Sequence, residues 1–254
     1  NTMEDVLQFT ACFNDLVPSR PTEHLGDSDL SFGGKLSPAL KIHEDGGESG
    51  CGGKVWIAGE LLCEFLLEKS DQQGLFSQWN SDTRFQSPIK KIVELGSGTG
   101  LVGLCLGLLN KQNKLKDMDI YVTDIDQLVP LMDRNIKLNE LEHVFPEELW
   151  WGAPLKPEFA PTRSNQRQID LILAADCVYL EKAFPLLEVT LLDLTSCEDP
   201  PIILMSYKKR RKADRHFFKQ IKKNFDVLEI NEFTRFDHYL KQKTHLFQLV
   251  RKFK

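Results

Sequence analysis

The sequence predicts an α/β fold with a seven-strand, mostly parallel sheet, an antiparallel last strand and an N-terminal extension. Three observations support this prediction. Short apolar segments alternate with helical patterns from Ile89 onward, which is typical of a parallel sheet covered by helices. A turn with three glycines, at residues 96–100, joins a buried strand to a buried helix. Only a polar linker around residues 231–243 separates the last two strands, so these two can pair antiparallel.

The regular alternation of strand and helix patterns begins at residue 89, so the sequence divides into two parts at about residue 88. A length of 254 residues allows one large α/β domain or two small ones. We expect residues 1–88 to form a hairpin and helix extension packed on the core, and residues 89–254 to form that core, as one structural domain overall. The hairpin is expected at residues 30–45, where alternating runs flank glycines or proline.

A glycine-rich segment, residues 46–53, precedes an amphipathic helix expected at residues 54–69. Its composition predicts no regular structure. Such a segment can cover a bound ligand as a lid or can be a plain linker, and composition leaves both interpretations open.

The core strands are predicted from short apolar, β-branched runs. They lie at residues 89–95, 119–123, 143–149, 169–175, 201–206, 225–230 and 244–251.

The glycine turn, ELGSGTG, begins at Glu94 and carries Gly96, Gly98 and Gly100. Glycine is needed where the backbone takes positive φ or where a ligand touches the main chain. The dinucleotide pattern G-x-G-x-x-G requires glycine where Leu101 stands, and a P-loop requires a Gly-Lys-Ser/Thr ending that this segment lacks. The spacing therefore argues against both of these nucleotide sites.

Glu94 indicates a different ligand. A carboxylate repels a pyrophosphate and suits a cationic or zwitterionic molecule. S-adenosylmethionine is such a molecule, since its amino acid end carries an ammonium group and its sulfur is a sulfonium. The alternative interpretation is a tight strand–helix turn that binds no ligand.

Asp124 ends the second predicted strand, about twenty-five residues after the glycine turn, where an acid hydrogen-bonds the ribose diol of a nucleoside cofactor. Asp126 is a near competitor. Its better interpretation is a charge that favours the dipole of the next helix, expected at residues 127–139.

The strand at residues 169–175 also ends in an acid, Asp176. Ligands of open α/β sheets bind beyond the carboxyl ends of the strands, so Asp176 falls where the methyl group of the cofactor is expected. The small Ala175 leaves room for an adenosine to lie flat. The alternative role for Asp176 is a cap for the following helix.

Two tryptophans are further candidates. Trp151 follows the third strand and can stack on an adenine face, although a core aromatic is the alternative. Trp56 precedes the N-terminal helix, and the residues alone favour a core position for it.

A basic run from Tyr207 to Lys212 follows the fifth strand. A solvated loop, a surface that docks an acidic partner and a nuclear signal are all open interpretations.

Composition limits the classes of function. The net charge of −5 argues against general affinity for nucleic acid. No apolar run reaches the length of a membrane span and no leader opens the sequence, so we expect a cytoplasmic protein away from the membrane. The six cysteines form no C-x-x-C pair, so we expect reduced thiols and no metal. No self-association segment is evident, and a monomer is expected.

The segments VELGSGTGLVGL, VTDID, ELWWG and AADCVYLEKAFPLL together resemble the seven-strand protein-lysine methyltransferases of family 16, the methyltransferase-like 21 group. The D-x-x-Y from Asp176 to Tyr179 matches the signature of that family. The resemblance covers nearly the whole chain. It implies a Rossmann-like methyltransferase fold, S-adenosylmethionine as cofactor and a lysine of a protein as acceptor.

The N-terminal DLVPSRPTEHLGDSDLSFGG and the KKRRKADRHFF segment look particularly like the fungal member that methylates a lysine of translation elongation factor 1-alpha. That factor is therefore the expected partner. The third strand and residues 156–168 depart most from the family, which leaves the target lysine undetermined.

The resemblance also implies the site. Beside Glu94, it implies cofactor contacts at Trp56, Gly96, Ser97, Gly98, Asp124, Trp151 and Ala175. Catalytic roles are expected for Asp176 and Tyr179. A free lysine has a pKa of about 10.4 and must lose a proton before it attacks a methyl group.

A carboxylate alone would raise that pKa, so Asp176 is expected to orient the amine rather than to act as a strong base. Tyr179 is expected to shape the lysine channel or simply to pack. Two alternatives stay open: methylation of RNA or of a small molecule, and a cofactor-binding interaction protein without catalysis.

Overall fold

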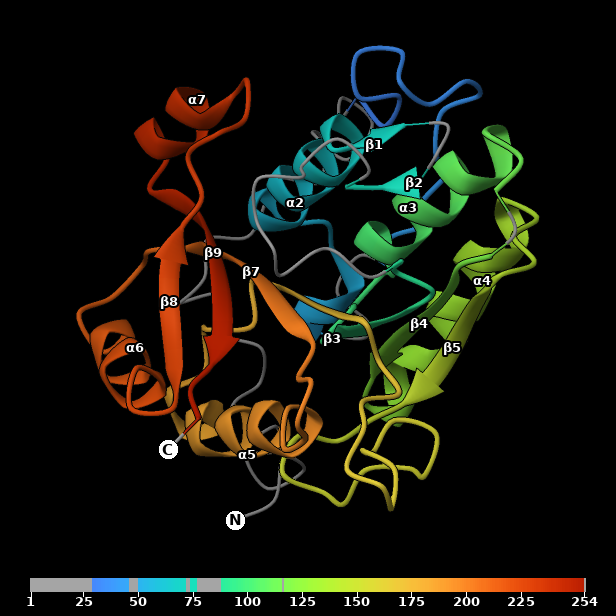
Figure 1. The fold of residues 1–254 in the computed structure, drawn as a ribbon. Coiled ribbons are helices and arrows are strands. Elements are labelled where there is room, and N and C mark those ends of the chain that lie inside the picture. The colour runs from blue at the N-terminus through green and yellow to red at the C-terminus, as the bar shows by residue number, and fades with distance from the viewer. Residues whose placement is uncertain (1–28, 46–49, 72–73, 77–87, 116, 254) are drawn as a thin grey trace.

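The computed structural model describes residues 29–45, 50–71, 74–76, 88–115 and 117–253. Its centre is a seven-stranded sheet in the order β5-β4-β3-β6-β7-β9-β8 (Figure 1). The strands are β3 (Lys91–Leu95), β4 (Asp119–Asp124), β5 (Val144–Glu148), β6 (Leu171–Ala175), β7 (Ile202–Lys208), β8 (Phe225–Glu229) and β9 (Thr244–Arg251). Each predicted core strand is confirmed to within two residues at either end.

The sheet is parallel from β5 to β7, and β9 pairs antiparallel with both β7 and β8. The predicted antiparallel end of the sheet is therefore confirmed, with β9 placed between β7 and β8. The chain runs outward from β3 to β5 and then returns to the other side of β3 as β6. Such a reversal opens a crevice beyond the carboxyl ends of the two central strands, which is where open α/β sheets bind ligands.

Helices cover both faces of the sheet (Figure 1). They are α2 (Ile57–Glu68), α3 (Leu101–Gln112), α4 (Val129–Leu138), α5 (Phe184–Leu194), α6 (Asp214–Ile221) and α7 (Phe236–Lys241), with short 3-10 turns η4 (Asp126–Leu128) and η5 (Glu181–Ala183). The side chains of β3 alternate, so Ile92 packs with α2 and α3 while Val93 packs with α5 and α6 on the opposite face. The N-terminal α2 thus buries its apolar side in the same core as α3.

The predicted hairpin at residues 30–45 is wrong, since the described residues there form turns and extended chain without a strand. The Asp29 carboxylate accepts the N–H groups of Ser31 and Gly33 at 3.0 and 2.8 Å, which closes a tight turn. The backbone of residues 41–43 forms hydrogen bonds with two amide side chains, one within α4 and one at its C-terminal end. Asn135 Oδ1 accepts the N–H of residue 43 at 2.7 Å, and Asn139 Oδ1 accepts that of residue 41 at 2.9 Å. These amides take the place of a second strand.

Other parts of the extension also differ from prediction. Residues Gly50–Gly53 form a 3-10 turn, η2, where no regular structure was expected, and residues 46–49 lie outside the described part. A small antiparallel pair, β1 (Ser70–Asp71) and β2 (Gly74–Leu75), follows α2. None of the described helices has both the length and the apolar character that crossing a membrane requires.

Candidate functional site

The glycine turn joins the end of β3 to the start of α3. Gly96, Gly98 and Gly100 have φ of 57°, 59° and 86°, in the left-handed region that side chains disfavour. A Cβ at Gly98 would lie 2.7 Å from the backbone oxygen of Gly52 in η2, and one at Gly96 would lie 3.1 Å from the Trp151 ring. The turn is therefore closed by backbone at Gly98 and by side chains at Gly96, and together with the positive φ this favours glycine at both positions.

Asp124 ends β4 directly beside this turn. Its Oδ2 accepts the Gly98 N–H at 2.9 Å and its Oδ1 accepts the Ile125 N–H at 2.7 Å. Burial raises the pKa of Asp124 to about 6, and the two backbone hydrogen bonds oppose that rise. A carboxylate held at a strand end with lone pairs to spare fits a ribose diol.

Ser97 connects the glycine turn to β4. Its N–H donates to the Thr123 oxygen at 2.9 Å, and its Oγ accepts the Thr123 N–H at 2.9 Å. The hydroxyl also donates to the backbone carbonyl oxygen of Glu94 at 3.2 Å. Ser97 thus holds the turn in register with the neighbouring strand.

Glu94 lies under the turn, fully buried, and its Oε1 accepts the Gly103 N–H in the first turn of α3 at 2.9 Å. Burial raises the pKa of Glu94 to about 8, so the neutral acid is the favoured form at pH 7. Burial therefore works against the negative charge that was expected for Glu94. Glu94 ties the end of β3 to α3 instead.

Replacing Glu94 with glutamine is expected to remove a pH dependence of stability. Between pH 4.5 and 8 the folded state keeps a proton on Glu94 that the unfolded state releases, so the free energy of unfolding falls as pH rises through this window. The loss is roughly 1.4 kcal/mol for each pH unit. Denaturant titrations at pH 5 and pH 8 measure it, with Glu142→Gln at an exposed position as control. An equal pH slope in both variants would contradict the assignment.

The two tryptophans lie in different places. Trp151 is 6% exposed and belongs to the core cluster of α5 and α6, with its ring edge at Gly96. Trp56 is half-buried at the residue before α2, and the Arg210 guanidinium carbon lies 5.9 Å from the centre of its ring. Ala175 is the last residue of β6 and is partly buried.

Asp176 follows β6 with a φ of +57°, and its side chain is only 7% exposed. Arg210 forms a two-pronged ion pair with it: Nη1 donates to Oδ1 at 2.7 Å and Nη2 donates to Oδ2 at 2.6 Å. Tyr179 is partly buried, which raises the pKa of its phenol, and its backbone oxygen accepts a hydrogen bond from Arg211.

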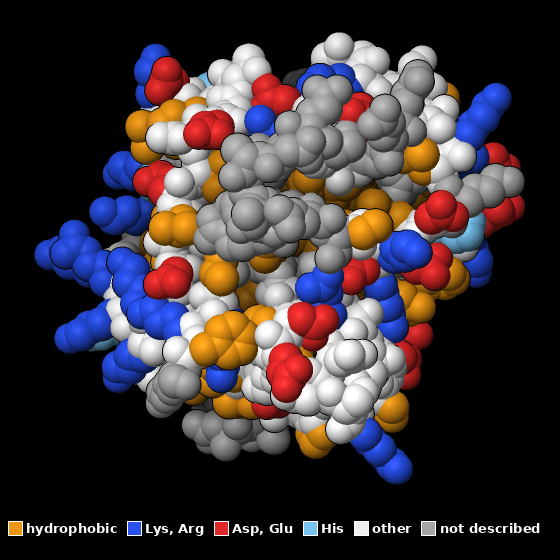
Figure 2. Space-filling model, in the orientation of Figure 1, with side chains coloured by type: hydrophobic (Ala, Val, Ile, Leu, Met, Phe, Trp, Pro, Cys, Tyr) orange, Lys and Arg blue, Asp and Glu red, His pale blue; other side chains and the backbone are white. Residues whose placement is uncertain are grey.

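Sequence reasoning missed Arg210. All three interpretations of the basic run treated it as a surface, but Arg210 is buried against Asp176. The strand order contained a usable signal, because Arg210 follows β7, and β7 lies next to β6, the strand that Asp176 follows. Lys209 and Lys212 are exposed, and Figure 2 shows basic side chains gathered on the flank where α6 lies.

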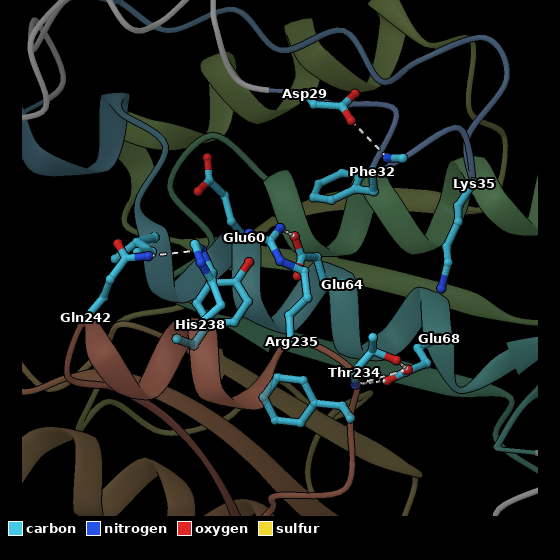
Figure 3. Close-up of a pocket in the computed structure, with 14 residues that line it drawn as sticks. Asp29, Phe32, Lys35, Glu60, Glu64, Glu68, Thr234, Arg235, His238 and Gln242 are labelled. Carbon is cyan, nitrogen blue, oxygen red and sulfur yellow. Dashed lines mark hydrogen bonds and ion pairs between the residues drawn. The ribbon is translucent and has the colours of Figure 1, made fainter.

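A hollow of about 660 Å³ lies between α2, α7 and residues 29–35 (Figure 3). Glu60, Glu64 and Glu68 line it from successive turns of α2. Arg235 is paired with Glu64 at 2.6 Å, and the Thr234 backbone N–H donates to Glu68 Oε1 at 3.1 Å. None of the predicted site residues lines this hollow, so it is distinct from the region around the glycine turn.

Known proteins resemble this chain over nearly all of its length. The sequence profile of a family described as lysine methyltransferase matches residues 35–224. The protein-lysine N-methyltransferase EFM6 of Saccharomyces cerevisiae is 64% identical over 243 residues, covering 94% of this chain and 97% of that protein. The protein N-lysine methyltransferase METTL21A of Danio rerio is 31% identical over 239 residues, covering 93% of each chain. Among solved structures, the SAH-bound Podospora anserina methyltransferase PaMTH1 aligns with a TM-score of 0.43 at 15% identity, covering 78% of this chain and 89% of that one.

Proposed function

This chain belongs to the lysine methyltransferase family and is a protein-lysine N-methyltransferase, and from that premise we propose its cofactor, site and substrate. The cofactor is S-adenosylmethionine, bound in the crevice beyond β3 and β4. The acceptor is a lysine of translation elongation factor 1-alpha, which reaches the cofactor beside Asp176.

One juxtaposition carries this proposal. The glycine turn follows β3, Asp124 ends β4 and Asp176 follows β6, so all three lie at the same edge of three adjacent parallel strands. The turn requires glycine, and the carboxylate of Asp124 is already bonded to the Gly98 N–H. These features fit the nucleoside and amino acid parts of S-adenosylmethionine. The identity of the partner is supported by the likeness of the N-terminal and KKRRKADRHFF segments to the fungal enzyme that acts on that factor.

In this proposal Asp124 binds the ribose hydroxyls, and the main chain at Gly96 and Gly98 approaches the amino acid end. Trp151 supports the turn and Trp56 closes the site from the side of α2. Glu94 and Ser97 act through the turn they hold. When bound, the cofactor supplies a methyl group activated by a positive sulfur.

Asp176 accepts a hydrogen bond from the acceptor amine and aims its lone pair, while Tyr179 shapes the channel. The lysine ammonium first gives a proton to water, which leaves a neutral nitrogen with a free lone pair. S-adenosylmethionine, when bound, would supply the methyl group to that nitrogen and would leave as S-adenosylhomocysteine. Positioning supplies most of the acceleration, because the methyl donor is already activated.

The test incubates the protein with methyl-labelled S-adenosylmethionine and purified elongation factor 1-alpha. Label is expected in the factor, is recovered as methyl-lysine after hydrolysis, and maps to one peptide. A parallel incubation with cell extract shows competing acceptors. Label in another protein would reject the proposed substrate, and label in RNA or small molecules would establish a different acceptor class.

A further inference from the structure

The Asp176–Arg210 pair is more than a surface ion pair. Both side chains are 7% exposed, and both carboxylate oxygens are engaged by the guanidinium fork. The pair lies at the carboxyl edge of β6 and β7, where the acceptor amine is proposed to enter. Its geometry is held from both sides, because Arg210 also lies against the Trp56 ring at the start of α2.

The charged groups around the pair come from several elements. At the start of α6, the Asp214 carboxylate accepts the Tyr207 hydroxyl at 2.8 Å and the backbone N–H of Arg210 at 3.3 Å. From the segment after β6, Cys177 and Tyr179 face the pair, and burial raises the pKa of both groups. Asp124 adds negative charge from β4, and Arg211 binds the Tyr179 oxygen. Burial opposes the charge of Arg210, but the bonds and charge of Asp176 outweigh it and raise its pKa.

Arg210 also has an unused donor. Within the described part of the chain, its buried Nε–H has no hydrogen-bond partner. A buried N–H without an acceptor is costly, so this donor would gain from a hydrogen bond to a bound ligand. Asp176 keeps acceptor capacity as well, because each carboxylate oxygen has a second lone pair. The charges of the pair therefore neutralise each other, but the pair can still form hydrogen bonds to a ligand.

Charge decides which form of lysine such a site accepts. An isolated carboxylate would favour the ammonium form, which has no lone pair and cannot accept a methyl group. A cation fixed beside that carboxylate cancels this preference, since two positive charges close together repel. A neighbouring cation is also a known way to make a lysine nucleophilic at neutral pH.

We propose that Arg210 is a positioning residue of the methyl transfer: it fixes the Asp176 carboxylate and places a cation beside the acceptor, so that the site binds the neutral amine in preference to the ammonium. This inference rests on the proposed acceptor site. It assigns the loss of the proton to substrate binding, before the transfer step.

The first test needs no turnover. Calorimetric titration of the wild-type protein, loaded with S-adenosylhomocysteine, with elongation factor 1-alpha at pH 8 in two buffers of different ionisation heat gives the protons released on binding. About one proton per complex is expected, because a free lysine is almost fully protonated at that pH. A factor whose mapped acceptor lysine is replaced by methionine should release none. Binding by the wild type without release of a proton would overturn the inference.

The second test compares pH profiles of kcat/KM. Arg210→Gln is expected to shift the midpoint to higher pH by about 1 unit, which is a roughly tenfold loss at pH 8. Arg210→Lys keeps a cation but loses the fork, so its midpoint should stay while the plateau falls. Lys223→Gln removes a charge from an exposed position outside the basic run and should change neither quantity.

The two tests distinguish a positioning role of Arg210 from a structural role, from a cofactor-binding role and from a wrong substrate. An unchanged midpoint in Arg210→Gln with a lower plateau would assign a purely structural role to the pair. A parallel fall in S-adenosylhomocysteine affinity would assign Arg210 to the cofactor instead. No transfer by the wild type to the factor would reject the proposed substrate, which leaves the profiles to be recorded on the acceptor that the extract experiment identifies.

Discussion

Asp176→Asn is expected to reduce methyl transfer roughly 100-fold or more, while the affinity for S-adenosylhomocysteine changes little. Asparagine keeps the shape of the side chain but loses the charge that holds Arg210 by two hydrogen bonds. The acceptor amine then loses the charged oxygen that accepts its hydrogen bond and the balanced charge of the pair. Single-turnover rates with saturating cofactor measure the first effect, and calorimetric titration measures the second.

This substitution also leaves a buried guanidinium without its partner, which costs about 3–5 kcal/mol of stability. Rates must therefore be compared well below the melting transition of each variant. Asp170→Asn is the matched control, because Asp170 precedes the same strand at its other end and also pairs with an arginine, Arg167, at 3.2 Å. Its activity should be retained. If Asp176→Asn transferred methyl groups at the rate of the control, Asp176 would have no part in positioning the acceptor.

Gly98→Ala is expected to weaken cofactor binding by about 10- to 100-fold, or about 1.4–2.7 kcal/mol. The residue has a φ of +59°, which costs a side chain about 1–2 kcal/mol. An added Cβ would also lie 2.7 Å from the Gly52 oxygen, and this contact is with backbone that must move. The displacement would disturb the bond from the Gly98 N–H to Asp124, which is proposed to hold the ribose.

Gly34→Ala separates the two causes. Gly34 has a φ of +83°, but no atom lies within 4 Å of its added Cβ. That variant should lose stability through its backbone conformation and keep its cofactor affinity. If Gly98→Ala lost stability to the same degree but bound S-adenosylhomocysteine as the wild type does, the turn would have only a structural role.

The glycine turn shows which structural features can be predicted from neighbouring residues alone. A buried strand, a turn with positive φ and a buried helix are each decided by neighbours in the chain, and all three lie where the pattern predicted them. Asp124 could also be predicted, because it is the residue at the end of a periodic run. Glu94 was predicted to carry a charge, but its burial under α3 favours the neutral acid, and that burial depends on packing between distant segments.

The N-terminal extension shows that contacts with distant residues can override a local sequence pattern. Alternating residues at 30–45 are compatible with a hairpin, but the amides of Asn135 and Asn139 hold that backbone instead. These partners are about 90 to 100 residues away, and no local pattern could identify them.

By itself, then, the sequence determined the seven strands of the sheet, the helices α2, α3 and α4, the glycine turn and the acids at the ends of β4 and β6. These follow from residue periodicity and backbone preference, which act over a few neighbouring residues. Only the tertiary structure decided that Arg210 pairs with Asp176, since this depends on β7 lying beside β6 and on both groups being removed from water. The charge of a buried site is a property of all the groups that share it, and those groups come from segments far apart in the chain.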